Sequence, residues 1–276
     1  MLILNRVIFL FATCLILFNS SAVSQQRNKE QARIEKNRRI NQMIRNEEEG
    51  VPAFEKHSIT SIKNHHDGWG IAFEKGFSTS AYKTTILQLE LTEKQHRKEQ
   101  KQSTPGSING GFAYFGRPFV FGKQNIFYQA KLGFGKQIML GGKSNKNGVA
   151  VYGIFLGGFS AGLARPYYIQ FSVDTGVAYL KYQAETKDAF LNLDPTKDII
   201  GGAGLRKGWN EIKFNPGVYA KASLRFDWAR FNQVVSAIEV GFMADLYSKK
   251  VVQMIDVSGR SFFPSGFIAL NFGRRK

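Results

Sequence analysis

The sequence predicts an all-β protein: an antiparallel, up-and-down, eight-stranded transmembrane β-barrel, preceded by an N-terminal helical or disordered periplasmic arm. Three observations predict this fold. The chain opens like an exported protein, its later segments alternate between apolar and polar residues, and 28 Gly, 24 Phe and 10 Tyr favour a closed sheet. Alternation with a period of two over about ten residues is what a membrane-spanning strand requires.

Residues 1–24 have the features of a signal peptide. A basic residue precedes the apolar run 7–18, and Ala22 and Ser24 occupy the −3 and −1 positions of a cleavage site. We expect cleavage near Ser24; an uncleaved anchor is the alternative, although the run is shorter than the roughly 20 residues of a membrane helix. Cys14 is the only cysteine and lies inside the run, so the mature chain has no disulfide and no CxxC site.

The net charge of +17 bears on the choice of partners. A basic exported chain is expected to meet outer-membrane lipid, lipopolysaccharide phosphates or an acidic protein of the periplasm or outer membrane, rather than nucleic acid. The alternative is that most of the lysines are simply solvated.

Residues 25–67 are predicted to form a periplasmic arm and linker ahead of the barrel, which is assigned to residues 68–276. The stretch 25–50 is charged and helix-permissive, and it ends at Gly50 as a helix does. Its apolar stripe is thin, so the arm is expected to be a marginal helix or disordered.

Alternation holds in eight later segments, most clearly where Leu224 and Phe226 oppose Ser223, Arg225 and Asp227. A soluble sandwich has the same period, so the polar side must decide between the two folds. That side is rich in glycine and carries charges of both signs, which suits a narrow lumen, and the apolar side suits lipid. The segments are residues 69–74, 87–92, 128–135, 149–163, 168–183, 218–228, 234–246 and 265–272.

The charges on the polar side are predicted to neutralise one another inside the barrel. Eight strands enclose an interior just wide enough for side chains, so we expect a blocked lumen, with a conducting channel as the alternative. The predicted lumen charge network comprises Glu74, Glu90, Lys131, Asp174, Lys221, Arg225, Asp227, Glu239 and Asp245.

The lengths of the connections test this topology. With the N-terminus in the periplasm, the short turns 163–166 and 228–232 face inward and the long loop 184–214 faces outward, as in known membrane barrels. The connection 94–124 breaks the pattern, because it is long and yet predicted to be periplasmic. Loops of such length usually carry function or disorder.

The centre of this connection, FAYFGRPFVF, holds five aromatic residues. Aromatic residues and arginine dominate the energetics of protein interfaces. Phe115, Arg117 and Phe119 are therefore the predicted partner-binding residues, with anchoring at the membrane interface as the alternative.

No catalytic residue, metal site or cofactor is predicted. The four histidines, His57, His65, His66 and His96, are all assigned to the periplasmic side, which leaves general-base chemistry on outer-leaflet lipid poorly supported. His65-His66-Asp67 lacks a distant fourth metal ligand and is interpreted as a solvated linker. The stretch 201–208, GGAGLRKG, lacks the GK[ST] ending of a phosphate-binding loop and is interpreted as a flexible external loop.

The alternating strands, the phrase FGKQNIFY and the closing strand GFIALNFGRRK resemble small outer-membrane barrel proteins of Gram-negative bacteria, in particular those of Bacteroidota. The resemblance covers roughly residues 69–276. One feature differs: many such barrels end on an aromatic residue, whereas here Phe272 is followed by Gly-Arg-Arg-Lys. The resemblance implies a non-enzymatic structural or accessory subunit of an envelope complex, of the barrel-assembly or type IX secretion kind. A small channel and a lipid-modifying barrel enzyme are the alternatives.

Overall fold

The computed structural model divides the chain into two compact units, Met1–Ala53 and Phe54–Lys276. In the first unit the described residues are helical and exposed, and the predicted signal peptide lies outside them. No described helix is long and apolar enough to cross a membrane. The structure describes residues 30–31, 33–38, 54–80, 82–103, 108–109, 112–113, 117–143, 148–173, 176–183, 186, 188, 190, 192–193, 198–229, 233–255 and 257–276.

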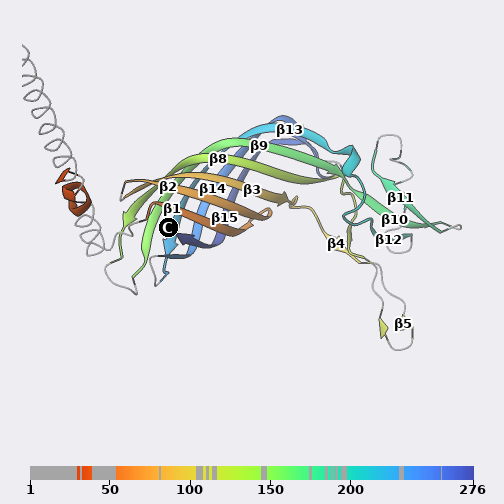
Figure 1. The fold of residues 1–276 in the computed structure, drawn as a ribbon. Coiled ribbons are helices and arrows are strands. Elements are labelled where there is room, and N and C mark those ends of the chain that lie inside the picture. The colour runs from red at the N-terminus through yellow and green to blue at the C-terminus, as the bar shows by residue number, and fades with distance from the viewer. Residues whose placement is uncertain are drawn as a thin grey trace, which may run out of the picture. The chain divides into compact units, whose positions relative to one another are not determined.

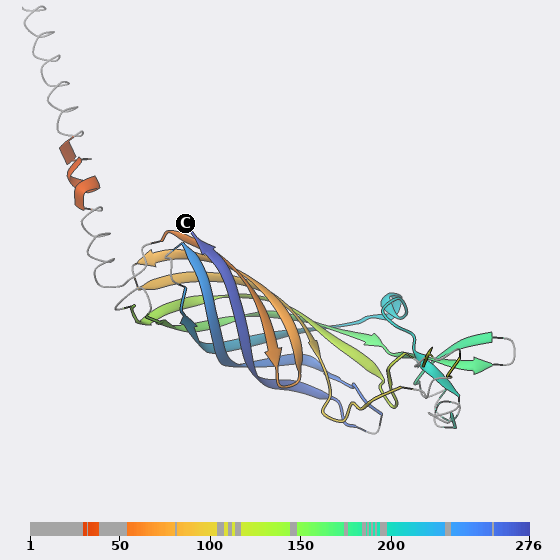
Figure 2. The same cartoon turned by 90° about the horizontal axis from the view of Figure 1, so that it is seen from below.

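The second unit contains a closed antiparallel barrel of eight strands, which confirms the predicted fold class (Figure 1). The strands follow one another around the barrel in chain order, and the first closes the ring by pairing with the last. They run obliquely around the barrel, as closure of a sheet requires (Figure 2). The barrel strands are β1 (Lys56–His65), β2 (Gly68–Ser80), β3 (Lys83–Lys94), β8 (Asn125–Gly141), β9 (Ala150–Pro166), β13 (Lys213–Asp227), β14 (Val234–Val251) and β15 (Arg260–Arg275).

The barrel strands turn their polar side chains inward and most of their apolar side chains outward. On β13, Ser223 and Arg225 are buried while Leu224 between them is 44% exposed. On β8, Lys131 is buried and its neighbour Leu132 is exposed. The outer surface is thus an apolar belt around a polar interior, the reverse of a soluble protein and the arrangement that lipid contact demands.

Strand β1 corrects the predicted linker, because residues 56–65 belong to the barrel. Its inward residues alternate regularly with exposed ones over ten positions. Three of the outward residues, Ser58, Thr60 and Asn64, are polar, so the strand lacks the apolar side that marks the other segments. The barrel therefore begins at Lys56 and not at Gly68.

The segment 168–183 was predicted to be a barrel strand, and this is wrong. It forms a hairpin of β10 (Tyr168–Val173) and β11 (Gly176–Lys181), which pairs with β12 (Ile199–Gly202) in a separate three-stranded sheet. Gly176 has a φ of 137°, a conformation that side-chain-bearing residues rarely adopt, which explains why the chain turns here.

These two corrections reverse the sides of the connections that lie between β1 and residue 168, and they leave those after residue 184 on their predicted sides. Both ends of the barrel chain, Lys56 and Arg275, pair near one rim, which we call the terminal end, together with the turns after β2, β8 and β13. The long connections 95–124 and 167–212 lie at the opposite rim, the loop end. The connection 94–124 thus shares an end with 184–214, and residues 163–166 belong to strand β9.

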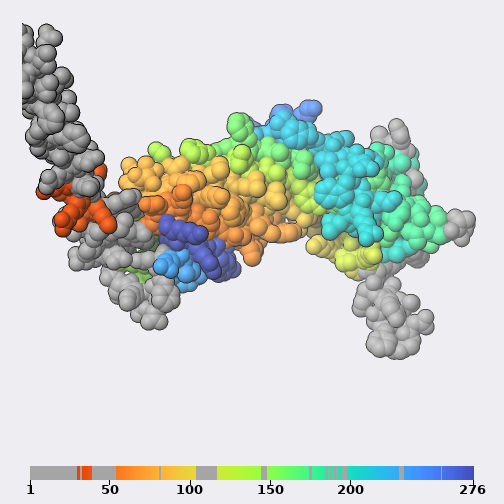
Figure 3. Space-filling model, in the orientation of Figure 1, coloured from red at the N-terminus to blue at the C-terminus, as the bar shows by residue number. Residues whose placement is uncertain are grey.

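The long connections meet in a small folded body at the loop end. We call the described residues of 117–123 and 167–212 the cap; they pack against one another in the space-filling view (Figure 3). The short elements outside the barrel are β4 (Lys101–Gln102), β5 (Ile108–Asn109), β6 (Phe112–Ala113), β7 (Phe119–Val120) and the 3-10 helix η1 (Trp209–Glu211), with β4 paired to β7 and β5 to β6.

Candidate functional site

The centre of the lumen is an ion-pair cluster around Arg225 of β13. Its guanidinium donates two hydrogen bonds to Glu74 of β2, at 2.8 and 2.7 Å, and two to Glu239 of β14, at 3.0 and 2.8 Å. Lys221 adds a hydrogen bond of 2.9 Å to Glu239. All four side chains are buried, so the two cations of β13 neutralise a carboxylate on the adjacent strand β14 and a carboxylate on β2, across the barrel.

Two further clusters extend this network along the barrel. Lys131 lies 3.0 Å from Asp245 and 3.6 Å from Glu90, and Glu90 also accepts a hydrogen bond from Lys63. Near the terminal end, Asp227 pairs with Arg275.

The structure places eight of the nine predicted network residues inside the barrel, and Asp174 lies outside the described residues. Sequence reasoning missed Lys63 and Arg275. The first lies on the unrecognised strand β1, and the second lies beyond Phe272, where the last segment was taken to end. The inward alternation of His57, Ser61, Lys63 and His65 was the signal that could have identified Lys63.

An aromatic cluster fills the lumen toward the loop end. The ring centroids of Phe127, Tyr247 and Phe263 lie 5.2 to 5.8 Å apart, and all three side chains are buried. Gly162 gives them room, because a Cβ there would lie 2.8 Å from Tyr247 and 2.9 Å from Phe127. Together with the charge clusters, these rings leave the interior occupied by side chains along its length.

The cap has an apolar core. Phe119, Ile169, Phe190 and Ile199 are buried together, and Phe121 stacks on Phe190 at 5.3 Å between centroids. This finding corrects the predicted role of Phe119: its side chain is 1% exposed, and burial in the cap core makes it unavailable to a partner. Arg117 is exposed, and Phe115 lies outside the described residues.

The histidines do not gather at one end of the barrel, although all four were predicted to lie on the periplasmic side. His57 and His65 point into the lumen, where His57 contacts Glu74 at 2.9 Å, while His66 is exposed at the loop end. His96 opens the long connection after β3 at that same end. His65 is buried in the lumen and His66 is exposed in the turn that follows β1, and no metal-binding group of His, Cys, Asp or Glu occurs among the described residues.

Asp67 lies in the turn between β1 and β2 at the loop end, and its carboxylate accepts hydrogen bonds from neighbouring side chains. Lys94 donates to its carboxylate at 2.6 Å and Ser265 at 2.8 Å. Burial alone would raise the pKa of Asp67, but the charge and hydrogen bonds of these two partners hold it below its usual value. The Ser265 hydroxyl is therefore engaged with a carboxylate and buried, although His65 lies 3.4 Å away.

The stretch 201–208 was predicted to be a flexible external loop, and in the structure it packs against the barrel. Arg165 of β9 points outward and donates to the carbonyl oxygen of Leu205 at 2.9 Å. Trp209 donates to the same oxygen from its indole nitrogen. Gly208 has a φ of 89°, and a Cβ there would lie 2.8 Å from the carbonyl oxygen of Pro166, so only glycine allows this close approach.

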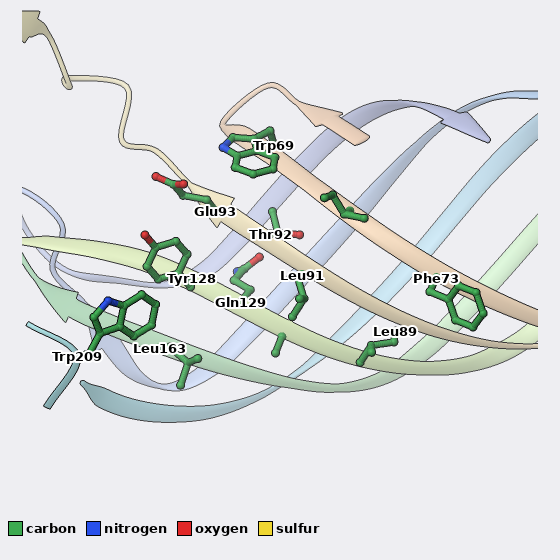
Figure 4. A pocket seen from close by; sticks show the side chains of 12 residues that line it. Trp69, Phe73, Leu89, Leu91, Thr92, Glu93, Tyr128, Gln129, Leu163 and Trp209 are labelled. Atoms are coloured by element: carbon green, nitrogen blue, oxygen red, sulfur yellow. The ribbon is translucent and has the colours of Figure 1, made fainter. Parts of the chain in front are cut away.

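An apolar groove of about 450 Å³ lies on the outside of the barrel beneath this stretch (Figure 4). It is lined by outward side chains of β2, β3, β8 and β9 and by Trp209 of η1. Trp209 and Tyr128 lie together at one end of the groove, and Phe73 and Leu89 lie at the other. The rings of Trp209 and Tyr128 are stacked at 5.9 Å, with the Arg165 guanidinium 4.8 Å from the first and 5.5 Å from the second.

No protein-family model and no curated protein matches the chain. Similar solved structures include Ail, the attachment invasion locus protein of Yersinia pestis, at 13% identity and a TM-score of 0.35, covering 81% of this chain and 100% of Ail. A second Ail structure, in complex with the heparin analogue sucrose octasulfate, has the same identity and TM-score, covering 80% of this chain and 98% of that one. Neisserial surface protein A matches at 7% identity and a TM-score of 0.38, covering 80% of this chain and 94% of its own.

Proposed function

We propose that the protein is a non-enzymatic barrel of the Gram-negative outer membrane, which holds the cap at the membrane surface as an accessory subunit of an envelope complex. The observation that carries the proposal is an inverted barrel with a filled lumen that ends in a folded cap. The apolar belt supports membrane insertion, and the predicted signal peptide, cleaved near Ser24, supports export. The Bacteroidota-like sequence features favour a complex of the barrel-assembly or type IX secretion kind.

The lengths of the connections support an orientation for the barrel. Outer-membrane barrels have short periplasmic turns and longer external loops. Here the two longest connections, 95–124 and 167–212, lie at the end opposite both barrel termini, so we place the terminal end and the N-terminal arm in the periplasm and the cap outside. Lys213, Lys249, Lys250 and Arg260 are exposed near the outer rim and suit the phosphates of lipopolysaccharide.

The lumen supports a scaffold rather than a channel or an enzyme. Its charges are paired, both between adjacent strands and across the barrel, and the cluster of Phe127, Tyr247 and Phe263 occupies the outer half. The arrangement of Ser265 and His65 is also unsuited to nucleophilic catalysis, because the hydroxyl donates to Asp67 and is buried from any substrate.

The cap offers the surface on which a partner protein would dock. β11 is an edge strand of the three-stranded sheet, and its side chains Val177 and Tyr179 are exposed. An exposed edge with apolar side chains can accept a strand or loop from another protein. Arg117, also exposed on the cap, adds a residue type that is common at interface hot spots.

Two measurements on the full chain test the proposal. In planar bilayers we expect no opening events from the purified barrel, with a porin prepared in the same way as the positive control. In cross-linked native membranes we expect the protein to co-purify with an envelope partner that Val177→Glu combined with Tyr179→Glu releases.

Val149→Glu is the matched control, because Val149 is an exposed apolar residue in a turn at the opposite end of the barrel. Steady conductance would contradict the scaffold role. Equal recovery of the partner with the cap variant and with the control would contradict docking on β11.

A further inference from the structure

We propose that the groove beside Trp209 is a binding site for one acyl chain of a membrane lipid. The inference rests on the proposed membrane location and adds a defined site to the general contact between barrel and lipid. The groove volume of about 450 Å³ lies within the roughly 300–1,000 Å³ of ligand pockets. Its outward lining is aliphatic and aromatic except for Glu93 at the rim, and it is continuous with the apolar belt, so its occupant is a hydrocarbon chain.

The groove originates in a local change of side-chain size. Ala130 of β8 pairs with Leu91 on one side and with Ala161 on the other. Two alanines side by side stand lower than the Leu, Ile and Phe residues of the surrounding belt. The sheet therefore has a depression here, and Leu91 on one side and Leu163 beside it give the chain apolar walls.

Trp209 makes one end of this depression a fixed wall. Its indole is held by the Leu205 carbonyl, by stacking on Tyr128 and by the nearby guanidinium of Arg165. A surface that is already ordered costs less conformational entropy when a ligand binds. We therefore expect a chain in the groove to be held more tightly than lipid elsewhere around the belt.

The charges beside the groove indicate that the chain, and not the head group, is recognised. Glu93 of β3 is the cross-strand neighbour of Tyr128, and the Arg165 guanidinium lies 5.5 Å from the Tyr128 ring. The Arg165 guanidinium is buried and donates to the Leu205 carbonyl, so no side chain that lines the groove offers a cation to the phosphate of a head group. We expect phosphatidylethanolamine and phosphatidylglycerol with the same chains to bind with similar affinity.

Tryptophan fluorescence provides the test, because Trp69 and Trp209 line the groove whereas Trp228, the third and last tryptophan, lies on the terminal side. The full chain is folded in detergent micelles and titrated with phosphatidylethanolamine brominated in mid-chain. With only Trp209 retained, we expect saturable quenching at a concentration about tenfold below that needed with only Trp228 retained. Phosphatidylglycerol of the same chains is titrated in parallel.

Groove-filling variants distinguish a site from random contact. Ala130→Phe, or the milder Ala130→Leu, should abolish the saturable quenching of Trp209. Ala222→Phe should leave it unchanged, because Ala222 is an outward alanine on β13, away from the groove.

Parallel quenching of Trp209 and Trp228 would overturn the site, and a tenfold preference for one head group would overturn chain-only recognition. The membrane location is tested separately by a heat-dependent gel shift: a membrane barrel should show the shift in micelles and not in detergent-free buffer, whether or not the groove binds a chain.

Discussion

The barrel and the cap bury opposite kinds of side chains. The barrel buries Arg225, Glu74 and Glu239 and exposes leucines, whereas the cap buries Phe119 and Ile169 as a soluble domain does. Both are built from antiparallel strands, so a period of two does not distinguish them. Strand length does: the barrel strands have 10 to 18 residues, and β10 and β11 have six each. Six residues are too few to cross the roughly 30 Å of a bilayer core, which takes about 9–11.

The largest expected effect comes from breaking the charge balance of the barrel interior. Arg225→Met leaves Glu74 and Glu239 buried without their shared partner, and breaking a buried ion pair costs about 3–5 kcal/mol. The measurement is the urea midpoint of the barrel in micelles. Arg274→Met is the matched control, since Arg274 is exposed on the same barrel, and a surface change should stay within about 0.5 kcal/mol. Equal midpoints for the two variants would show that the lumen pairs do not stabilise the fold.

A similar truncation in the cap should leave the barrel intact. Phe119→Ala removes a fully buried ring from the cap core, and such changes cost about 3–5 kcal/mol. We expect limited proteolysis to cut the cap of this variant while the heat-dependent gel shift of the barrel is unchanged. Arg117→Ala, two residues away and exposed, is the control and should resist the protease like the wild type. Simultaneous loss of cap and barrel would show that the two regions fold as one.

The smallest of these effects concerns adjacent residues on opposite faces of β13. Leu224→Arg places a charge in the apolar belt and should cost about 2–4 kcal/mol near the bilayer centre. Ser223→Ala removes a hydrogen bond of 2.8 Å to Glu239, which keeps Lys221 and Arg225 as partners, so we expect a loss of about 1 kcal/mol. Folding free energies in lipid vesicles check both values. A larger loss at Ser223 than at Leu224 would contradict the inverted assignment.

The number of strands was predictable although one strand was misplaced. Seven of the eight alternating segments lie in barrel strands, and the eighth strand is β1 instead of 168–183. Asp174-Thr175-Gly176 interrupts that segment with residues typical of turns, so the alternation across it belongs to two short strands. Exchanging one strand for another preserved the count but moved every connection between the two misplaced strands to the opposite end of the barrel.

The lumen was more predictable than the groove. A residue on the polar side of a barrel strand faces the interior, so the sequence identified Glu74, Lys221 and Arg225 without knowledge of their partners. The groove depends on Trp209, which approaches Tyr128 only because the 205–209 stretch folds back onto Arg165. A contact between residues that far apart in sequence leaves no local pattern.

The seam between β1 and β15 has a consequence for the order of assembly. Ser61 and Asn271 are hydrogen-bonded across it although 210 positions in the sequence separate them. Inside the lumen, Arg225 and Glu74 are hydrogen-bonded although they are 151 positions apart. Contacts between such distant residues form slowly. Until the ring closes, carboxylates and cations on its strands lack their partners, and an open sheet would carry them unpaired into hydrocarbon. We therefore expect closure to accompany or precede insertion, and a chain that lacks only β15 to place none of its earlier strands stably in the membrane.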